Sequence, residues 1–566
     1  MVKKLLYISG ILFSALAARA ATVVSEDAKV PKHYVQPVIG NGSICTSVDF
    51  EGEQVQKKYR SYYPEVVWAG RRYARTDNNS ALITMGHYKT DITVNGKPLG
   101  KLLSWSQRLD RENALIECLA KYERATVRTQ AFAPMGLDML AVKKSVEPNG
   151  GPAEVEIKFT YFLTDADSVK NPPRMIVEKP VGSPESASIK YAAYGLKVYR
   201  GEIAVFPSAA SKFEAGKNSA AFETSFAEGK PAEASYLVAY ADNYNTDIAG
   251  DIERLAGKIA KGGRKAPYSD VVKLSGIARR DEFPESVRDG RAAELRKTAK
   301  KGYDKILEEH KKLWADYYAQ GSAISIPDAE ISDAYLTALY HMKSVATRWS
   351  FPVTLFGHGA GWSGRFFGFD EMFAQSGAVS SGKFDLSVRT PNFRKAILPI
   401  AMRRVQHYSD NAEKKFGARY AWETLEDGAE GAPNPAGFWI DHVFHMANIA
   451  NSCWKHYLYT GDKKFLEETG YPVIRECAAF YYSHMLYEDA GGRTIFGRCT
   501  DIERLGPAVL NAFMSSCGAI YNFEIASRAA AALGVDADYA KKLSDAAKRL
   551  RESLPRNSEM YLPFDG

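Results

Sequence analysis

The periodicity of apolar residues changes from that of strands to that of helices near Pro284, and this change constrains the fold more than any other feature of the chain. Before it, segments such as SALITMGHYKTDITVNGKPLG alternate apolar and polar residues and contain the hairpin signal Asn95-Gly96. Many strand patterns joined by polar turns, without helical patterns between them, predict a large antiparallel β-sandwich over residues 21–283.

The segment 284–320 is charged and helical in pattern, so we expect it to be a helical linker between domains. From residue 321 to residue 566 the pattern is helical almost throughout, with long connections that carry Gly, Pro, Trp and acidic residues. Helices of similar length joined by elaborate loops are typical of an α-helical toroid or solenoid. A length of 566 residues also requires two or more hydrophobic cores. The sequence therefore predicts a multidomain β + α protein.

The N-terminus indicates export. It has cations at Lys3 and Lys4, a short apolar run over residues 5–16 and an A-x-A site that ends at Ala20. This pattern predicts a secretory signal peptide over residues 1–20, too short for a membrane span, and hence a periplasmic or secreted protein. Hydrophobic residues at 45% and charged residues at 25% exclude a disordered or membrane-embedded chain. The net charge of +7 is spread along the chain and does not indicate a nucleic-acid partner.

The six cysteines are not spaced as a dense disulfide scaffold. Cys453 and Cys477 fall on consecutive predicted helices, where they could meet, and Cys499 and Cys517 lie further along the chain. We expect buried free thiols for at least some of the six. The chain has neither a C-x-x-C motif nor a histidine cluster, so we expect no metal and no cofactor.

The loop FGHGAGWSGRFFGFDEMF, residues 356–373, is a candidate ligand-binding segment. Its glycines let the backbone approach a ligand, and Trp362 would stack on a sugar ring while Asp370 and Glu371 hold its hydroxyls. The alternative is a glycine-rich connection into a helix, because acidic residues in a first turn favour the helix dipole.

A second loop, GARYAWETLEDGAEGAPNP over residues 417–435, joins two predicted helices. It is strongly acidic and carries a tryptophan, which solubility alone does not require. We therefore expect Arg419, Trp422 and Glu423 to line the same site.

These two loops and the segment GRCTDIERLGPAVLNAF, residues 497–513, resemble glycoside hydrolase family 65 and the six-hairpin glycosidase clan, which includes maltose and kojibiose phosphorylases and acid trehalases. The family's Gly-x-Gly-x-x-Gly loop and the Phe-Trp-Asp-Thr-Glu after it lie without gaps on Gly359, Gly361, Gly364, Phe367 and Glu371. Its Gly-Ala-Arg-Phe-Pro-Trp-Glu resembles GARYAWE at residues 417–423. The resemblance implies an (α/α)6 barrel over residues 321–566 behind the sandwich.

The resemblance also implies a general acid, because the Glu of the family's Gly-Pro-Asp-Glu falls on Glu503. The reaction needs a carboxylic acid that is still protonated, and partial burial raises the pKa enough for that. Asp501 is the rival assignment, since residues two apart point the same way in an extended segment. A third interpretation pairs both carboxylates with Arg498 and Arg504.

Two features depart from the family. Its motif Asp is displaced by one position to Asp370, which would suit a sugar other than glucose. The helical pattern also ends before it completes a barrel, so we expect a truncated barrel whose terminal helices expose apolar surface. Leaving that surface in water costs about 25 cal/mol of free energy per Å². The general base would then come from the missing half; in a complete chain it would be Asp370, Glu371, Glu423 or Glu426, or belong to a partner subunit.

We therefore expect an exported glycosidase that hydrolyses a bond of an oligosaccharide or polysaccharide with inversion and uses Glu503 as acid. The predicted sugar site comprises Trp362, Asp370, Glu371, Arg419, Trp422 and Glu423. Hydrolysis is preferred to phosphorolysis because a sugar phosphate conserves bond energy only inside a cell. The alternatives are a polysaccharide lyase, for which His442, His445, Tyr481 and Tyr482 are candidates, and a non-catalytic glycan-binding protein. The oligomeric state stays open.

Overall fold

The structure, a computed structural model, describes residues 21–565 except positions 27, 33, 55–64, 75–79, 164–173, 253, 255–283, 322–323, 354–361, 363, 407–415, 433–440 and 503–504. The predicted signal peptide therefore lies outside the described residues. The chain divides into two compact units. Unit 1 comprises Met1–Arg71, Leu82–Tyr244 and Phe283–Val345, and unit 2 comprises Arg72–Ala81, Asn245–Glu282 and Ala346–Gly566.

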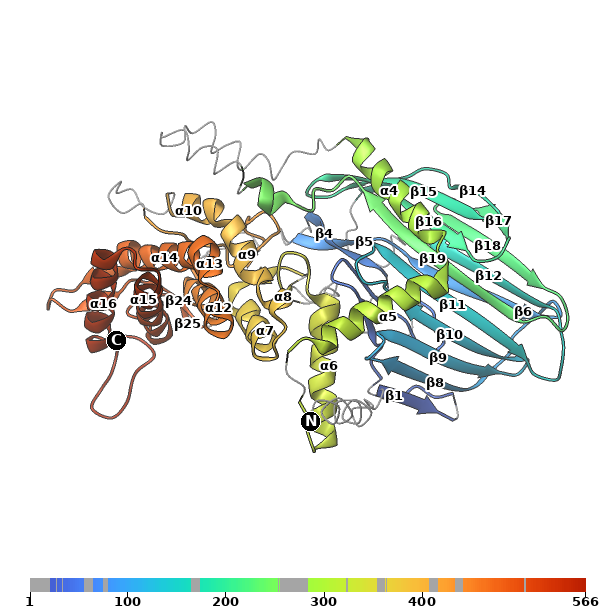
Figure 1. The fold of residues 1–566 in the computed structure, drawn as a ribbon, viewed down its shortest axis with the longest axis horizontal. Helices are drawn as coiled ribbons and strands as arrows, with labels where there is room; N and C mark the ends of the chain where they lie inside the picture. Colours follow the sequence, from blue (N-terminus) through green and yellow to red (C-terminus); the bar gives the residue numbers. More distant parts are fainter. Residues whose placement is uncertain are drawn as a thin grey trace, which may run out of the picture. The chain divides into compact units, whose positions relative to one another are not determined.

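Antiparallel sheets form most of unit 1, which confirms the β-architecture predicted for the N-terminal part (Figure 1). Within the described residues the largest sheet has ten strands, in the order β1-β8-β9-β10-β11-β19-β16-β15-β13, with β14 paired to β15. Its strands are β1 (Ala21–Ser25), β8 (Leu102–Asp110), β9 (Leu115–Tyr122), β10 (Ala125–Phe132), β11 (Met139–Pro148), β13 (Arg174–Val177), β14 (Val181–Ser183), β15 (Ser186–Tyr194), β16 (Val198–Pro207) and β19 (Ala232–Asp242).

Two smaller sheets complete the β-structure. One has the order β17 (Lys212–Ala215), β18 (Ser219–Phe226), β12 (Val155–Phe162), β6 (His87–Val94) and β7 (Lys97–Pro98), and the other has the order β2 (Val38–Gly40), β3 (Ile44–Ser47), β4 (Val67–Ala74) and β5 (Ser80–Thr84). The hairpin predicted at Asn95-Gly96 is confirmed, because Val94 pairs with Lys97 across a two-residue turn. Both turn residues have positive φ, 49° and 69°, as such a turn requires.

The segment predicted as a linker forms two helices, α4 (Glu285–Ala299) and α5 (Tyr303–Ala319), and α6 (Ala329–Val345) follows them in unit 1. Tyr303 and Ile306 pack with Phe132, Met139 and Leu237 of the largest sheet in one hydrophobic cluster. Both α4 and α5 therefore contribute directly to the packing of unit 1 (Figure 1).

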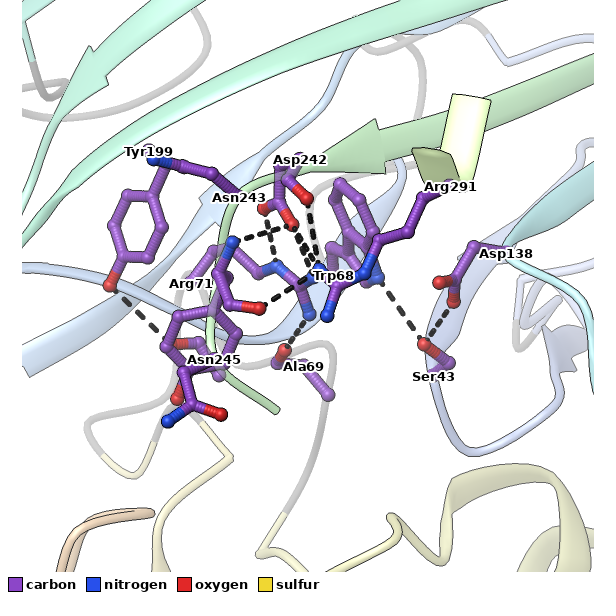
Figure 2. A network of polar contacts seen from close by, with 12 residues as sticks. Ser43, Trp68, Ala69, Arg71, Asp138, Tyr199, Asp242, Asn243, Asn245 and Arg291 are labelled. Carbon is purple, nitrogen blue, oxygen red and sulfur yellow. Dashed lines mark hydrogen bonds and ion pairs between the residues drawn. The ribbon is translucent and has the colours of Figure 1, made fainter. Parts of the chain in front are cut away.

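A buried polar network ties β4 to β19 and α4 within unit 1 (Figure 2). The Arg71 guanidinium donates two 2.8 Å hydrogen bonds to the Asp242 carboxylate and lies 3.6 Å from the centre of the Trp68 ring. Arg291 of α4 donates to the Asp242 carbonyl oxygen at 2.9 Å. Both charges of the Arg71–Asp242 pair are fully buried, and such a pair is tolerated only when hydrogen bonds satisfy it in this way.

Unit 2 is predominantly helical, which confirms the helical C-terminal part. Its helices include α7 (Gly368–Ser380), α8 (Phe384–Ser387), α9 (Arg389–Ala396), α10 (Leu398–Gln406), α12 (His445–Thr460), α13 (Lys463–Phe465), α14 (Tyr471–Phe480), α15 (Phe513–Leu533) and α16 (Ala537–Glu552), with π-helical turns η3 (Leu466–Gly470) and η4 (Tyr481–Met485). Short strand pairs join β20 (Phe366–Phe367) to β21 (Glu423–Thr424), β22 (Leu486–Glu488) to β23 (Thr494–Phe496), and β24 (Cys499–Asp501) to β25 (Leu505–Val509). Across the part of the chain that is described, no helix combines the length and apolarity needed to cross a bilayer.

Glycines let α7 and α15 approach α12 closely. A Cβ on Gly368 of α7 would lie 2.9 Å from Ile449 Cγ1, and a Cβ on Gly518 of α15 would lie 3.2 Å from Ala447 Cβ. Both positions lack the atom that would push the helices apart. The helix α12 therefore packs between α7 and α15, which positions the cavity described below.

Exposed large apolar side chains in the described part of unit 2 occur around α7, at the start of α15, at the end of α12 (Leu458 and Tyr459) and after α16 (Met560 and Tyr561). Phe373 and Met514 are about half exposed, whereas Leu543 and Leu550 of α16 are buried. All six cysteines are described, and all are free thiols, with five buried and Cys517 half-buried. This confirms the expectation of buried free thiols.

Candidate functional site

A cavity of about 710 Å³ opens in unit 2 beside α7, α12 and α15. Trp362, Phe369, Asp370 and Phe373 line it from the first predicted loop and the start of α7. Among the described lining residues Asp370 is the only carboxylate, and none is Lys, Arg or His. The described part of the cavity wall therefore offers apolar rings and one carboxylate, an arrangement suited to an uncharged ligand with both an apolar face and hydroxyls.

Four aromatic side chains among the described lining residues are exposed on the cavity wall: Trp362, Phe369, Phe373 and Tyr521. Trp362 is 52% exposed and Phe373 is 59% exposed, and Phe369 meets Phe373 edge to face with ring centres 5.1 Å apart. A contiguous group of exposed apolar rings is typical of a surface that binds a ligand or a partner. Their location agrees with the stacking role predicted for Trp362, which remains a prediction.

Asp370 and Glu371 are adjacent in sequence but lie in opposite environments. A helix turns by about 100° per residue, so Asp370 faces the cavity while Glu371 is fully buried. Arg394 donates from its Nε to Glu371 Oε2 at 3.0 Å, and its Nη1 donates to Thr424 Oγ1 at 2.8 Å. Burial raises the pKa of Glu371, and the Arg394 charge opposes that shift. Glu371 is thus placed in the core and does not line the cavity.

The second predicted loop meets the first through the pairing of β20 with β21, which sets Phe367 opposite Glu423. Trp422 is buried, and its ring stacks on His442 with centres 4.6 Å apart and lies 5.6 Å from Phe367, which itself lines the cavity. Arg419 is also buried and donates to the His442 carbonyl oxygen at 3.1 Å. The structure therefore brings the two loops together, with Arg419 and Trp422 packed behind the cavity wall.

Two further carboxylates of the second loop are held by buried arginines. Glu423 forms an ion pair with Arg365. Glu426 accepts from Arg72 at 2.7 Å and 2.8 Å, and Arg72 also donates to the Gly364 carbonyl oxygen. Glu371 of α7, a third such carboxylate, is paired with Arg394. Of the four carboxylates considered as the general base, Asp370 is therefore the one that lines the cavity.

Asp501 lies at the end of β24 and is 1% exposed. Its carboxylate accepts from Met514 N–H at 3.1 Å, from Ser515 N–H at 3.1 Å and from the Ser515 hydroxyl at 2.8 Å. Burial raises the pKa of Asp501, and these hydrogen bonds oppose the shift. Arg498, the partner considered for it, donates instead to the Ala508 carbonyl oxygen at 2.9 Å.

Glu503, the predicted acid, and Arg504 lie outside the described residues. The residue before them, Ile502, lines the cavity and is 52% exposed. The chain therefore reaches the cavity one position before Glu503.

Sequence reasoning missed the α12 and α15 side of the cavity. Asn448 and Asn451 line it from α12, and Tyr521 of α15 donates a 2.7 Å hydrogen bond to Asn451 Oδ1. The available signal was two amides three residues apart in the sequence MANIAN of α12, a spacing that places them on one face of a helix.

Most residues considered for a lyase are buried and contact other residues of unit 2. His442 lies under Trp422, and His445 is buried with its Nε2 3.1 Å from the Tyr420 carbonyl oxygen. Burial lowers the pKa of His445 well below the usual histidine range. Tyr481 is buried and donates to the Val443 carbonyl oxygen at 2.8 Å.

The resemblance to the six-hairpin glycosidases inferred from the sequence is confirmed by comparison with known proteins. Residues 403–558 match the catalytic domain of glycosyl hydrolase family 95.

Characterised relatives agree with this class. A kojibiose hydrolase of Mucilaginibacter mallensis is 25% identical over 243 residues, which are 42% of this chain and 34% of that protein. A nigerose phosphorylase of Lachnoclostridium phytofermentans is 28% identical over 204 residues, which are 32% of this chain and 25% of that protein. The matched region thus spans about a third or less of these relatives.

The fold agrees with a solved structure. A human-microbiome protein described as a kojibiose phosphorylase superposes with a TM-score of 0.70 over 97% of this chain and 73% of that one, at 13% identity. This likeness extends through both units, because it covers almost the whole chain.

Proposed function

We propose that this protein is an exported glycosidase that hydrolyses a glycosidic bond of an uncharged oligosaccharide or polysaccharide with inversion, on a helical domain of the (α/α)6 type. The observation that carries the proposal is the 710 Å³ cavity, which combines exposed aromatic rings and Asp370 with Ile502, the neighbour of Glu503. Sugar rings present an apolar face to aromatic side chains and hydroxyls to carboxylates.

In the proposed reaction Glu503 donates a proton to the departing glycosidic oxygen. A second carboxylate then activates water on the opposite face of the sugar, at about 6.5–9.5 Å from the acid in inverting enzymes. Glu371, Glu423 and Glu426 are held in ion pairs with arginines, which leaves them poorly suited to that task. Asp370 is in a position to hold sugar hydroxyls or to orient the water.

Hydrolysis is preferred to phosphorolysis because of the predicted export. The N-terminal pattern is that of an exported protein, for which a sugar phosphate is a poor product. The relatives include kojibiose hydrolases as well as phosphorylases, so both reactions occur among them. Product analysis with and without inorganic phosphate distinguishes the two: activity that depends on phosphate would reverse the preference.

The decisive experiment screens the purified protein against aryl glycosides and the disaccharides kojibiose, nigerose and trehalose. Glu503→Gln should lower kcat by several powers of ten and retain binding, because the amide keeps the shape of the side chain but cannot donate the acidic proton. The matched control is Glu467→Gln, on an exposed position of η3, which should leave kcat unchanged. Full activity in Glu503→Gln would refute the assignment.

The lyase alternative is not favoured, since His445 and Tyr481 are buried and engaged by backbone groups. It predicts an unsaturated product that absorbs in the ultraviolet. The observed product of an active preparation therefore separates the two reactions directly.

A further inference from the structure

The strand β24 is anchored on one side by the start of α15. Both Asp501 carboxylate oxygens accept hydrogen bonds there, Oδ2 from Met514 N–H and Oδ1 from Ser515 N–H and the Ser515 hydroxyl. These donors belong to the first turn of α15, where backbone N–H groups lack partners within the helix. Asp501 therefore caps the N-terminus of α15, although Ser515 lies fourteen residues further along the chain.

The same strand is anchored on its other side by the segment that leads into α12. Thr500 N–H donates to the Asp441 carbonyl oxygen at 3.3 Å, and Thr500 forms a parallel bridge with His442. The helices α12 and α15 both line the cavity. The end of β24 is thus fixed to two walls of the same cavity.

Directly after this anchor the backbone turns sharply. Ile502 has a φ of 44°, a conformation that a β-branched residue rarely adopts and that persists only where neighbouring contacts hold it. Its side chain is exposed and lines the cavity. A Cβ on Gly506 would lie 2.8 Å from Thr500 Oγ1, so the returning strand β25 also passes close to the anchor.

We infer that Asp501 is a positioning residue, which uses its cap on α15 to hold the backbone at Ile502 beside the cavity. The inference rests on the proposed function, because Glu503 follows Ile502 in the sequence. Asp501 is not the acid itself in this scheme, since both of its carboxylate oxygens accept hydrogen bonds from the start of α15 and its side chain is buried.

The test compares Asp501→Asn and Ser515→Ala with the unmodified protein on an aryl glycoside that the protein cleaves. Misplacement of a catalytic group by a fraction of an ångström to an ångström lowers rates strongly, so kcat should fall about 10- to 100-fold. The KM should change less than about twofold, because the aromatic cavity wall is untouched. Ser515→Thr, which keeps a hydroxyl, should restore most of the loss caused by Ser515→Ala.

The matched control is Asp462→Asn. Asp462 caps α13 by accepting from Phe465 N–H at 3.0 Å, and it does not line the cavity. A purely structural cap would lower the melting temperature in both Asp variants and leave kcat and its pH profile unchanged. Amide hydrogen exchange over residues 499–509 should accelerate in Asp501→Asn and stay unchanged in Asp462→Asn.

The outcomes separate this inference from the proposed function. Unmodified kcat and unmodified hydrogen exchange in Asp501→Asn overturn the inference. A loss in Asp501→Asn as complete as that in Glu503→Gln, with the fold retained, overturns it as well by making Asp501 the acid. Full activity in Glu503→Gln refutes the proposed function, and the hydrogen-exchange result then still decides whether Asp501 holds the turn.

Discussion

Glu371 and Arg394 form an ion pair in which both side chains are fully buried, although Glu371 directly follows a residue that lines the cavity. The Arg394 Nε lies 3.0 Å from Glu371 Oε2. Arg394 is further held by Thr424 of β21, within the second loop. This pair therefore joins α7, α9 and the second loop, and its principal contribution is to the packing behind the site.

Removal of one partner of this pair should destabilise the protein. Glu371→Gln leaves the Arg394 charge buried and uncompensated, at a cost of about 3–5 kcal/mol in the free energy of unfolding. Denaturant unfolding measures this loss, and the double change Glu371→Leu with Arg394→Met should recover much of it. A stable Glu371→Gln protein that has lost sugar binding would instead support the ligand role predicted from the sequence.

Substitution of Trp362 should weaken sugar binding without loss of stability. Its ring is half exposed, so Trp362→Ala should leave the melting temperature within a degree or two while raising Kd about fivefold, equivalent to about 1 kcal/mol. Calorimetric titration with a disaccharide that the protein binds measures the change.

The contrasting variant to Trp362→Ala is Trp422→Ala. Its buried ring packs on His442 and Phe367, so its loss should cost about 3–5 kcal/mol of stability. Equal effects of the two variants on melting temperature would contradict the environments described for the two rings.

Asp49 should make the stability of unit 1 depend on pH. Burial, together with the charges of Glu51 and Glu53, raises the pKa of Asp49 to about 7, while Lys144 acts in the opposite direction. Because the folded state binds this proton more tightly, the stabilisation is present at low pH and is lost as the pH rises through about 7. Its full size is on the order of 4 kcal/mol.

Asp49→Asn tests this dependence. The amide oxygen can still accept from the backbone N–H groups of Glu51 and Glu53, as Asp49 Oδ1 does at 3.0 Å. Urea unfolding at pH 5 and pH 8 should show a smaller difference between the two pH values than in the unmodified protein. An unchanged difference would assign the pH dependence to other groups.

Gly417 should tolerate no side chain. Its φ is 94°, and a Cβ there would lie 2.1 Å from the Phe480 backbone nitrogen. Gly417→Ala therefore combines backbone strain with a clash and should cost more than about 2 kcal/mol. Gly461→Ala is the matched control. Gly461 also has a positive φ, 65°, but no atom lies within 4 Å of the added Cβ. Only backbone strain of about 1 kcal/mol is therefore expected. Equal thermal shifts for the two variants would contradict the close approach at Phe480.

Local patterns in the sequence were sufficient to predict the order of the β-structure and the helices along the chain. The alternation before Pro284 and the helical pattern after it predicted antiparallel sheets and a helical C-terminal part, and the turn at Asn95-Gly96 predicted its hairpin. These features depend on neighbouring residues and on the period at which side chains face a core, both of which the chain carries locally. The motifs of the two loops were likewise sufficient to indicate the glycosidase class.

The environments of individual side chains depended on residues far along the chain. Asp370 and Glu371 look equivalent in sequence, but Arg394 lies on the side of only one of them. Asp501 looks like a second candidate acid until Ser515 is seen to donate to it. The partner of a carboxylate, and its access to water, are set by which distant element packs against it, and only the tertiary structure determines that.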